Sequence, residues 1–420
     1  MNKFLRNVVA LASGTATAQL LTLIFLPVLT RLYGPEAFGI YGTFMAFFLI
    51  LAPLSVLSYS IAIVLPKSDE EAKGLMVLSV VIGLIVFFLS LLFFMIFMEK
   101  LAILLKLELS PWALFFIPFA LLFYGVHQVF NYWFLRIGRY KMLGFFSAFN
   151  SLINNIARFG FYYIAPTGFA LIFCGVLQYF THVLMMFRSV YISSRSVVMP
   201  LSYKYLIYLA VKYKDYPLFR TPQLLINSLS NSIPVIVIAS LFSQEEVGHF
   251  TLAWSITSAP ALLIGQAIGS VFYPEIAKKI NAGNKVNNLL AKLFSILASI
   301  SFFPFLVMFM FGDVIFTMGF GNNWLMAGQY ASYLTVAVFL GLVHRPCEAY
   351  IQAANRNKMY VLFEVSSLVL SIILMYMAYS IFSSSIVVVQ AFVLAKALYY
   401  IVMIAYSYYD SRSNNLVIRI

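Results

Sequence analysis

The sequence predicts an all-α polytopic membrane protein, with twelve transmembrane helices in two pseudo-symmetric six-helix lobes around a central cavity. Composition, long apolar runs and an internal repeat lead to this fold class. The 420 residues are 63% hydrophobic and 10% charged, whereas soluble domains are about 45–50% apolar and about 25% charged. The composition therefore excludes a soluble globular domain and a disordered chain.

Twelve apolar runs are long enough to cross a bilayer as helices, which takes about 20 residues each. In chain order they cover 8–30, 38–63, 75–98, 111–135, 142–163, 167–190, 217–242, 247–275, 291–316, 324–353, 359–382 and 385–407. Membrane β-strands would be about ten residues long with strict alternation, which these runs lack. The first run is longer than the core of a signal peptide, so we expect it to be retained as the first helix.

Lysine and arginine residues determine the expected orientation. Of the 27, three lie in outer loops, four lie within the runs, and the remaining 20 lie on the cytoplasmic side if the N-terminus is cytoplasmic. The three in outer loops are Arg31, Lys100 and Lys106. The four within the runs are Arg158, Arg220, Arg345 and Lys396. Basic loops resist translocation, so both termini are expected in the cytoplasm. This asymmetry also explains the net charge of +13 without a nucleic-acid partner.

An internal repeat relates the two halves of the chain. Leu32–Tyr41 (LYGPEAFGIY) aligns with Leu241–Phe250 (LFSQEEVGHF), and Arg139–Met142 (RYKM) aligns with Arg356–Met359 (RNKM). An offset of six helices preserves orientation, so the repeats are expected to be parallel, about an axis along the membrane normal. We expect an N-terminal lobe over 1–200, a cytoplasmic linker over 201–216, and a C-terminal lobe with a short cytoplasmic tail over 217–420.

Sequence patterns that would indicate catalysis or a bound cofactor are absent. Cys174 and Cys347 lie in apolar runs, and the four histidines form no HExxH or other metal-ligand spacing. The segment Gly265–Ser270 (GQAIGS) lacks the lysine of a phosphate-binding loop. We therefore expect a protein that is not an enzyme and that binds no cofactor or metal.

Polar residues recur at helical spacing on several apolar runs. Because polar groups are costly in a bilayer, they are expected to face a cavity or a partner helix. The candidates to line a polar cavity are Gln19, His127, Asn131, Asn150, Asn154, Gln223, Asn227 and Asn231. The alternative is that such side chains join helices by hydrogen bonds.

Cations outnumber acids within the runs, which favours an anionic substrate. Arginine side chains are suited to phosphate groups in particular. The candidate cationic set is Arg31, Arg158, Arg220, Arg345 and Lys396. The alternative for Arg31, Arg158 and Arg220 is extension to the membrane interface, because they lie near the ends of runs.

Two acids and three glycines complete the candidate site. Glu348 and Glu364 are candidates for coupling to H⁺ or Na⁺, and the three-residue spacing of Arg345 and Glu348 would let them pair on one helix face. Small residues permit close helix approach. The glycines with this expected role are Gly14, Gly265 and Gly269.

A family resemblance rests on three segments, Leu29–Tyr41 (LTRLYGPEAFGIY), its repeat at Glu245–Gly248 (EEVG), and Gly138–Lys141 (GRYK). The chain resembles polysaccharide flippases of the Wzx-like, O-antigen type, in the multidrug/oligosaccharidyl-lipid/polysaccharide exporter superfamily. The resemblance covers essentially the whole chain.

This resemblance implies a flippase for undecaprenyl-pyrophosphate-linked oligosaccharide in the bacterial inner membrane, serving O-antigen or capsule synthesis by alternating access. The head group would cross through the cavity while the lipid tail stays in the bilayer, entering at a lateral gate flanked by helices one and eight. Candidate partners are membrane lipid, H⁺ or Na⁺, a polymerase and a chain-length regulator. The alternatives are a multidrug/ion antiporter of the same superfamily and a membrane polysaccharide polymerase.

Overall fold

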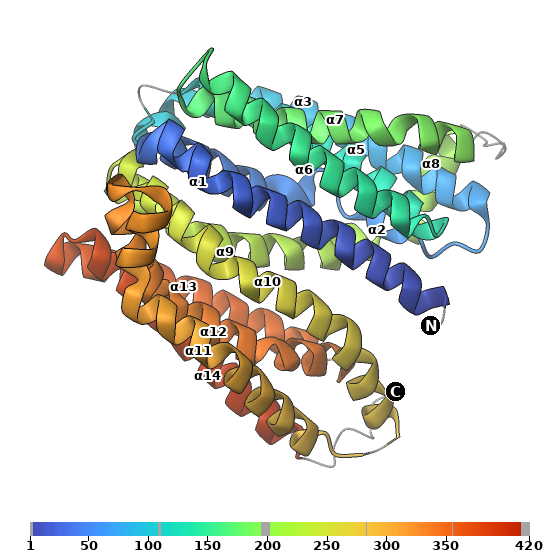
Figure 1. Ribbon diagram of the computed structural model, residues 1–420. Coiled ribbons are helices and arrows are strands. Elements are labelled where there is room, and N and C mark those ends of the chain that lie inside the picture. The colour runs from blue at the N-terminus through green and yellow to red at the C-terminus, as the bar shows by residue number, and fades with distance from the viewer. Residues whose placement is uncertain (1–2, 108–110, 195–201, 283, 355, 413–420) are drawn as a thin grey trace. The chain divides into compact units, whose positions relative to one another are not determined.

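The computed structural model is helical, with no strand among the residues that it describes, 3–107, 111–194, 202–282, 284–354 and 356–412 (Figure 1). Side chains are described from Ala12 onward, except those of 262–274, 281 and 357. The chain divides into two compact units, Met1–Ser232 (unit 1) and Ile233–Ile420 (unit 2). The division falls inside a helix, later than the linker expected over 201–216.

Unit 1 is organised around three mutually packed helices, α5, α6 and α7. In chain order its elements are α1 (Lys3–Leu51), η1 (Ala52–Leu54), α2 (Tyr59–Ala62), α3 (Asp69–Leu104), α4 (Trp112–Phe115), α5 (Ile117–Arg136), α6 (Tyr140–Tyr162), α7 (Gly168–Ser194), α8 (Tyr203–Lys212), η2 (Tyr216–Arg220) and the first part of α9 (Thr221–Leu241). α1 contacts α6 and α7, and α5 contacts α3 and α7. These contacts position the polar stripes of α5 and α6 inside the unit.

The element α1 contains a sharp turn at Gly34, whose φ of 72° and ψ of 173° are not helical. Glycine tolerates this left-handed φ because it has no Cβ. Before the turn, α1 runs parallel to α6. Gly14 lies against Gly144 near one end, and the Tyr33 hydroxyl donates to the Arg158 carbonyl oxygen at 2.6 Å near the other.

After the turn, α1 runs parallel to α7, because Tyr41 lies against Gly175 and Phe48 packs on Tyr179. Hydrogen bonds between α6 and α7 show that these two helices are antiparallel. The two parts of α1 are therefore antiparallel as well. This reversal agrees with the separate runs expected at 8–30 and 38–63.

The run expected at 38–63 is not one continuous helix. It passes through η1 and a turn before α2, and within that turn Leu57 and Ser58 have left-handed φ values of 47° and 58°. Irregular backbone inside a bilayer must be shielded from lipid by other parts of the protein. α5 shields this segment by approaching it closely at Gly125, where a Cβ would lie only 2.9 Å from Val56 Cγ1. Pro53 in η1 is the local signal of this break, because proline cannot continue the hydrogen bonding of a helix.

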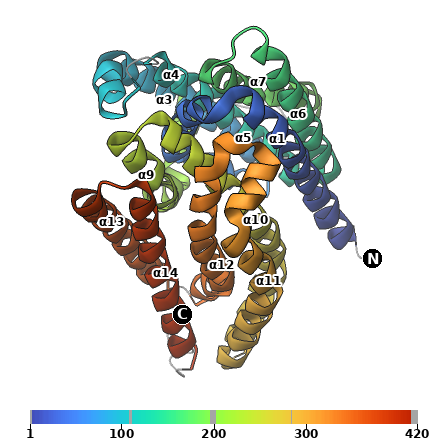
Figure 2. The ribbon, with the colours of Figure 1, turned by 60° about the vertical axis from the view of Figure 1, so that its left-hand side comes forward.

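Unit 2 is organised around α12. Its elements are the rest of α9, α10 (Gln244–Asn281), α11 (Asn287–Phe320), η3 (Asn322–Trp324), α12 (Leu325–Ala353), α13 (Asn357–Phe382) and α14 (Ser385–Asp410). α12 contacts α10, α11 and α14, and α13 lies beside α14 (Figure 2). The fully buried Tyr330 and Tyr350 of α12 mark the centre of the unit.

Nine helical segments among the described residues are long and apolar enough to cross a membrane. The chain is therefore a multi-pass membrane protein. One of the nine, Ala12–Leu54, overlaps both of the runs expected at 8–30 and 38–63. α6 and α10 match the runs expected at 142–163 and 247–275 but are not among the nine, and the asparagine stripe makes α6 less apolar. The count of twelve spans stays a prediction.

The expected linker contains α8, which packs against α3. Leu209 is fully buried there, and Gly74 of α3 leaves room for it. The Glu71 carboxylate accepts hydrogen bonds from Lys212 and Tyr213. These contacts place the linker helix in unit 1 and explain why the division between the units comes after it.

Candidate functional site

Unit 2 brings together four charged side chains that the sequence singles out. They are Arg345 and Glu348 of α12, Glu364 of α13 and Lys396 of α14. Arg345 Nη1 lies 3.0 Å from Glu348 Oε2, one helical turn later. The pairing expected from their spacing is therefore present.

Glu364 and Lys396 are almost fully buried, with exposed fractions of 4% and 3%. The Tyr399 hydroxyl donates to Glu364 Oε2 at 2.7 Å, and Lys396 Nζ lies 5.6 Å from the centre of the Tyr399 ring. Lys396 and Glu364 also attract each other electrostatically. Burying an ion without partners costs several kcal/mol, so these contacts make both charges tolerable in one buried network.

His344 lies at the centre of this network and is 1% exposed. Its Nδ1 lies 3.8 Å from Glu348 Oε1, outside hydrogen-bond distance, and neither ring nitrogen has a hydrogen-bond partner. The Tyr399 and Tyr400 rings flank it at centroid distances of 5.6 and 5.1 Å. The two carboxylates balance the two cations when His344 is neutral, so gain or loss of one proton changes the net charge of the network.

η2 and α9, which follow each other directly, carry a polar stripe of a different kind that begins at Arg220 of η2. Arg220 and Asn231 are exposed, and Gln223 and Asn227 are half-buried. The hydrogen bonds of the stripe run along the helix, from Arg220 Nη1 to Gln223 Oε1 at 3.0 Å and from Asn231 Nδ2 to the Asn227 carbonyl oxygen at 2.8 Å. Exposed polar groups on a membrane-spanning helix are costly against lipid. We therefore expect this face of α9 to border water or a polar partner rather than lipid.

The surroundings of Arg220 suit an anion. No acid pairs with it among the side chains that the structure describes. The phenol groups of Tyr132 and Tyr216 lie near enough to interact with it electrostatically. A guanidinium beside hydroxyl groups, without a carboxylate, is an arrangement that binds phosphate oxygens.

The asparagine stripe of α6 joins helices within unit 1. Asn150 and Asn154 are 2% and 5% exposed. Their side-chain amides donate to the carbonyl oxygens of Gln178 and Cys174 on α7, at 3.1 and 2.6 Å. These contacts correspond to the packing alternative rather than to a cavity lining, because both amides are occupied by the neighbouring backbone.

Arg158 lies at the end of the same stripe and is positioned by an aromatic residue. Its Nη2 donates to the Tyr41 hydroxyl at 2.9 Å, and the guanidinium carbon lies 5.1 Å from the centre of that ring. Its Nε is buried and has no hydrogen-bond partner. Within the described chain no carboxylate pairs with it, so its charge is not neutralised inside unit 1.

The other expected site residues have varied surroundings. Gly14 lies in a tight helix crossing within unit 1, where a Cβ would come within 2.1 Å of the Gly144 Cα. Gly265 and Gly269 lie in the part of α10 whose side-chain surroundings are outside the described residues. Gln19 and Asn131 are half-buried, and Arg31 is exposed.

Aromatic and imidazole partners are what sequence reasoning missed. Tyr399 lies three residues after Lys396, on the same face of α14, and this spacing is the one signal that could have found it. His182 of α7 lies against the expected His127 of α5, with ring centroids 4.4 Å apart. The pairing of these two histidines depends on tertiary contact and has no local signal.

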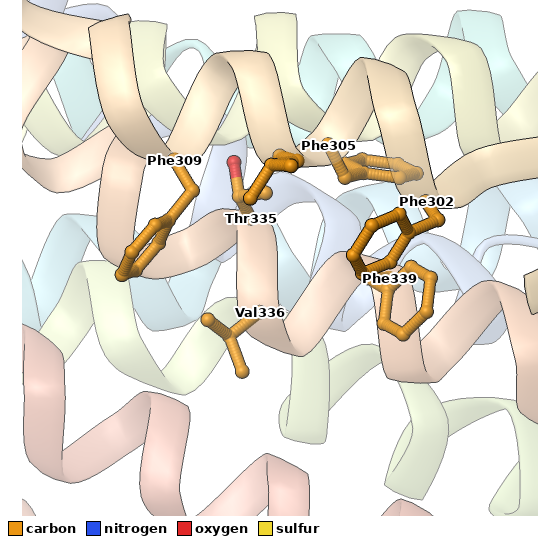
Figure 3. Close-up of a pocket in the computed structure, with 7 residues that line it drawn as sticks. Phe302, Phe305, Phe309, Thr335, Val336 and Phe339 are labelled. Carbon is orange, nitrogen blue, oxygen red and sulfur yellow. The ribbon is translucent and has the colours of Figure 1, made fainter.

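Two apolar pockets lie away from these polar groups. One, of about 130 Å³, lies between α11 and α12 and is lined by phenylalanines around Thr335 and Val336 (Figure 3). Another, of about 560 Å³, lies in unit 1 between η1, α3 and α5, with Ser90 as its one polar lining residue. Neither pocket suits a charged head group.

A family model described as "Polysaccharide biosynthesis protein" matches residues 28–329, well over half of the chain. The chain belongs to this family. A curated relative, the teichuronic acid biosynthesis protein TuaB of Bacillus subtilis (strain 168), is 25% identical over 138 residues. That match covers 33% of this chain and 29% of the relative, so the chain spans under a third of the length of that relative.

Solved transporters share the fold of this polysaccharide biosynthesis protein. The lipid II flippase MurJ, in an inward closed conformation, superimposes with a TM-score of 0.72 at 14% identity, covering 96% of this chain and 88% of that one. An inward-facing MATE family transporter of the MOP superfamily gives 0.67 at 14% identity, covering 97% and 96%. The multidrug transporter DinF-BH, in complex with R6G, gives 0.68 at 17% identity, covering 98% and 96%. The expected all-helical, two-lobe fold is confirmed.

Proposed function

We propose that this polysaccharide biosynthesis protein is a flippase for a saccharide linked to undecaprenyl pyrophosphate. It would move these units from the cytoplasmic to the outer leaflet of the bacterial inner membrane by alternating access, with both termini cytoplasmic. The product would serve synthesis of a surface polysaccharide such as O-antigen or capsule. The observation that carries the proposal is the open polar face of α9, because a membrane-spanning helix needs such a face only where it borders a hydrophilic path.

The head group would contact this face at its basic end. Arg220 has phenol groups beside it and no acid partner, so its guanidinium is available for pyrophosphate oxygens. Gln223, Asn227 and Asn231 continue along the helix as amides, which suit sugar hydroxyl groups because they both donate and accept hydrogen bonds. Arg158 supplies a second cation without a carboxylate in unit 1.

The network of unit 2 would serve energy coupling. Glu348 and Glu364 are the acids that would exchange H⁺ or Na⁺, as expected from the sequence. Both are already paired, with Arg345 and with Tyr399 respectively. A coupling ion would therefore act by displacing one of these internal partners. Uptake by proteoliposomes with and without an imposed gradient of each ion distinguishes the two ions.

The test of the proposal is the sidedness of lipid-linked units in cells that lack the gene. We expect these units to accumulate on the cytoplasmic face and the surface polymer to be depleted. Expression of the wild type should restore both, Arg220→Ala should restore under a tenth of the wild-type level, and Arg220→Lys should restore part. The matched control is Arg139→Ala, because Arg139 is exposed and binds the Ser189 hydroxyl at 2.7 Å.

A normal level of periplasmic units in the deletion strain would show that this chain is not the flippase for them. If deletion causes the defect and Arg220→Ala complements fully at low expression, the flippase proposal stands and the role of α9 is wrong.

Multidrug export is the second candidate, because the fold match includes DinF-BH in complex with R6G. A cationic drug needs an available carboxylate, whereas the buried acids of unit 2 are paired. We therefore expect no increase in resistance to cationic dyes on expression of this chain, which a growth assay measures.

A further inference from the structure

The linker helix α8 carries an apolar ridge on the side opposite its contact with α3. Leu209, on the inner side, is fully buried and lies against Gly74 of α3. The ridge consists of Tyr203, Ile207 and Val211, which follow one another at four-residue spacing and are 77%, 44% and 60% exposed. A helix on the surface of a soluble protein has polar and charged residues opposite its buried stripe. The outer side of α8 therefore suits a less polar neighbour than water.

Two membrane-spanning segments determine where α8 lies. It crosses α3 near the beginning of that helix, because Leu209 lies against Gly74 and Lys212 binds the Glu71 carboxylate (Figure 1). Three residues, 213–215, connect α8 to η2, where the apolar segment that includes α9 begins. With ten residues α8 is too short to cross a bilayer, which takes about 20. We therefore expect α8 at the membrane surface where α3 and α9 begin.

Basic and aromatic side chains flank the ridge. Lys204 lies beside it, Lys214 follows the end of the helix, and both are exposed. Lys212 is bound to Glu71, whereas no acid pairs with Lys204 or Lys214 among the side chains that the structure describes. Tyr208 is 55% exposed, and tyrosine is enriched where membrane meets water because its ring is apolar and its hydroxyl is polar.

The acids near α8 lie away from the ridge. α8 itself contains no aspartate or glutamate. Glu70 of α3 interacts electrostatically with Tyr205, which is on the side of α8 that faces α3. Asp215 lies beyond the end of the helix, next to Lys214. The outer side of α8 thus combines apolar and cationic groups, the pattern of a helix that lies on an anionic membrane.

We propose that α8 is an interfacial helix that binds the head groups of anionic phospholipids. Tyr203, Ile207 and Val211 enter the boundary between head groups and acyl chains, and Lys204 and Lys214 extend to the lipid phosphates. Apolar burial and electrostatic attraction both contribute to the binding of such helices.

Contact with lipid at α8 acts on the irregular segment of unit 1. The Tyr59 hydroxyl of α2 donates to the Ala210 carbonyl oxygen of α8 at 2.9 Å, directly after the turn at Leu57 and Ser58. An anchored α8 therefore holds the segment that interrupts the second expected run. This binding depends on neither the transported substrate nor the flippase proposal.

The test is the depth of single nitroxide labels on the full-length protein in nanodiscs that contain phosphatidylglycerol. Cys174 and Cys347 are buried, so labels attach at the introduced cysteine. Labels at Ile207→Cys and Val211→Cys should collide more with oxygen, which concentrates in lipid, than with a water-soluble nickel chelate. The control Lys67→Cys, exposed in the loop before α3, should show the reverse.

Two results at these positions would overturn the proposal. More collisions with nickel than with oxygen would place the ridge in water. Protection from both reagents would show that protein covers the ridge, either another part of the chain or a second copy. Both labels are at exposed positions, so they do not disturb the contact with α3.

The role of the lysines is tested by exchanging the lipid. In nanodiscs of phosphatidylcholine alone, the ratio of oxygen to nickel collisions at Val211→Cys should be about twofold lower, because anionic head groups attract basic residues near the surface. Adding Lys204→Gln and Lys214→Gln should give the lower ratio in both lipids, whereas adding Lys285→Gln, an exposed lysine of unit 2, should change neither. Equal ratios in the two lipids without these substitutions would show that α8 does not select anionic lipid.

Discussion

The two units differ in their polar interiors. Unit 1 buries the amides of Asn150 and Asn154, which are bonded to the backbone of the next helix, and its interior cation Arg158 is bonded to the Tyr41 hydroxyl. Unit 2 pairs its charged groups with one another or with a phenol, as Arg345 with Glu348 and Glu364 with Tyr399. The difference shows that two units built from apolar helices can hold different buried chemistry.

This difference assigns separate roles to the units. Amides bonded to backbone stabilise helix contacts and cannot change charge, whereas the network of unit 2 consists of ionisable groups, which the proposed coupling role requires. α9 differs from both, because its polar side chains are partly exposed and bond along their own helix. Packing, coupling and substrate contact are therefore expected to respond to different substitutions.

The largest effect is expected where unit 2 would be left with an unbalanced charge. Glu364→Leu removes the carboxylate beside Lys396, and breaking a buried pair in this way costs about 3–5 kcal/mol. Thermal unfolding in detergent should show a large loss, and the double variant Glu364→Leu/Lys396→Leu should regain most of it. A double variant less stable than the single one would show that the two charges are not coupled.

A smaller effect on stability is expected in unit 1. Asn154→Ala removes the side-chain hydrogen bond to the Cys174 carbonyl oxygen, which keeps its helical partner, and opens a small cavity between α6 and α7, at a combined cost of about 1–3 kcal/mol. Transport per folded molecule should be unchanged. The control is Asn227→Ala on α9, which should leave the unfolding temperature almost unaffected. If folded Asn154→Ala lost transport, the result would show that this amide takes part in transport and does not only join helices.

The crossing of α1 and α6 offers a comparison between two glycines of unit 1. A Cβ on Gly14 would meet Gly144 at 2.1 Å, whereas a Cβ on Gly160 of α6 would meet nothing within 4 Å. We expect Gly14→Ala to destabilise by about 1–3 kcal/mol, as overpacking does, and Gly160→Ala to be neutral or slightly stabilising. Equal unfolding temperatures for the two variants would contradict the close crossing.

The smallest effect concerns the linker helix α8, which we expect to lie outside the membrane. The hydrogen bond to Glu71 raises the pKa of Lys212 above its ordinary value. A raised folded-state pKa contributes stability that is present below the unfolded-state pKa and is lost as pH rises through the folded-state pKa. Wild type should therefore lose a small increment of stability at strongly alkaline pH. Lys212→Met should lack that increment when unfolding temperature is measured against pH. Parallel profiles of unfolding temperature against pH for the wild type and the variant would show that the Lys212–Glu71 contact contributes no such increment.

Much of the fold could be predicted from the sequence, because a bilayer demands long apolar helices. The reversal at Gly34 and the pairing of Arg345 with Glu348 follow from local patterns, a glycine–proline turn and a three-residue spacing. Pro53 indicates where the helix breaks, but the left-handed turn at Leu57 and Ser58 could not be predicted, because it depends on the close approach of α5 at Gly125. Such cover is a tertiary feature with no local signal.

The candidate site was predictable in its residue types and less so in their roles. Sequence periodicity puts Asn154 and Asn227 in equivalent polar stripes, yet one is buried against a backbone carbonyl and the other is half-buried on an open face. Which neighbour a stripe meets is decided by packing. The same holds for Lys396, whose environment depends on Glu364 from a helix earlier in the chain.

The most direct test of the central claim is translocation by the purified protein in proteoliposomes that contain a fluorescent lipid-linked oligosaccharide pyrophosphate. A reagent that destroys the exposed head group from outside measures the fraction that has crossed. The account predicts rapid crossing with the wild type and with Arg139→Ala, at least tenfold slower crossing with Arg220→Ala, and intermediate crossing with Arg220→Lys. Wild-type liposomes that translocate no faster than protein-free liposomes would contradict it.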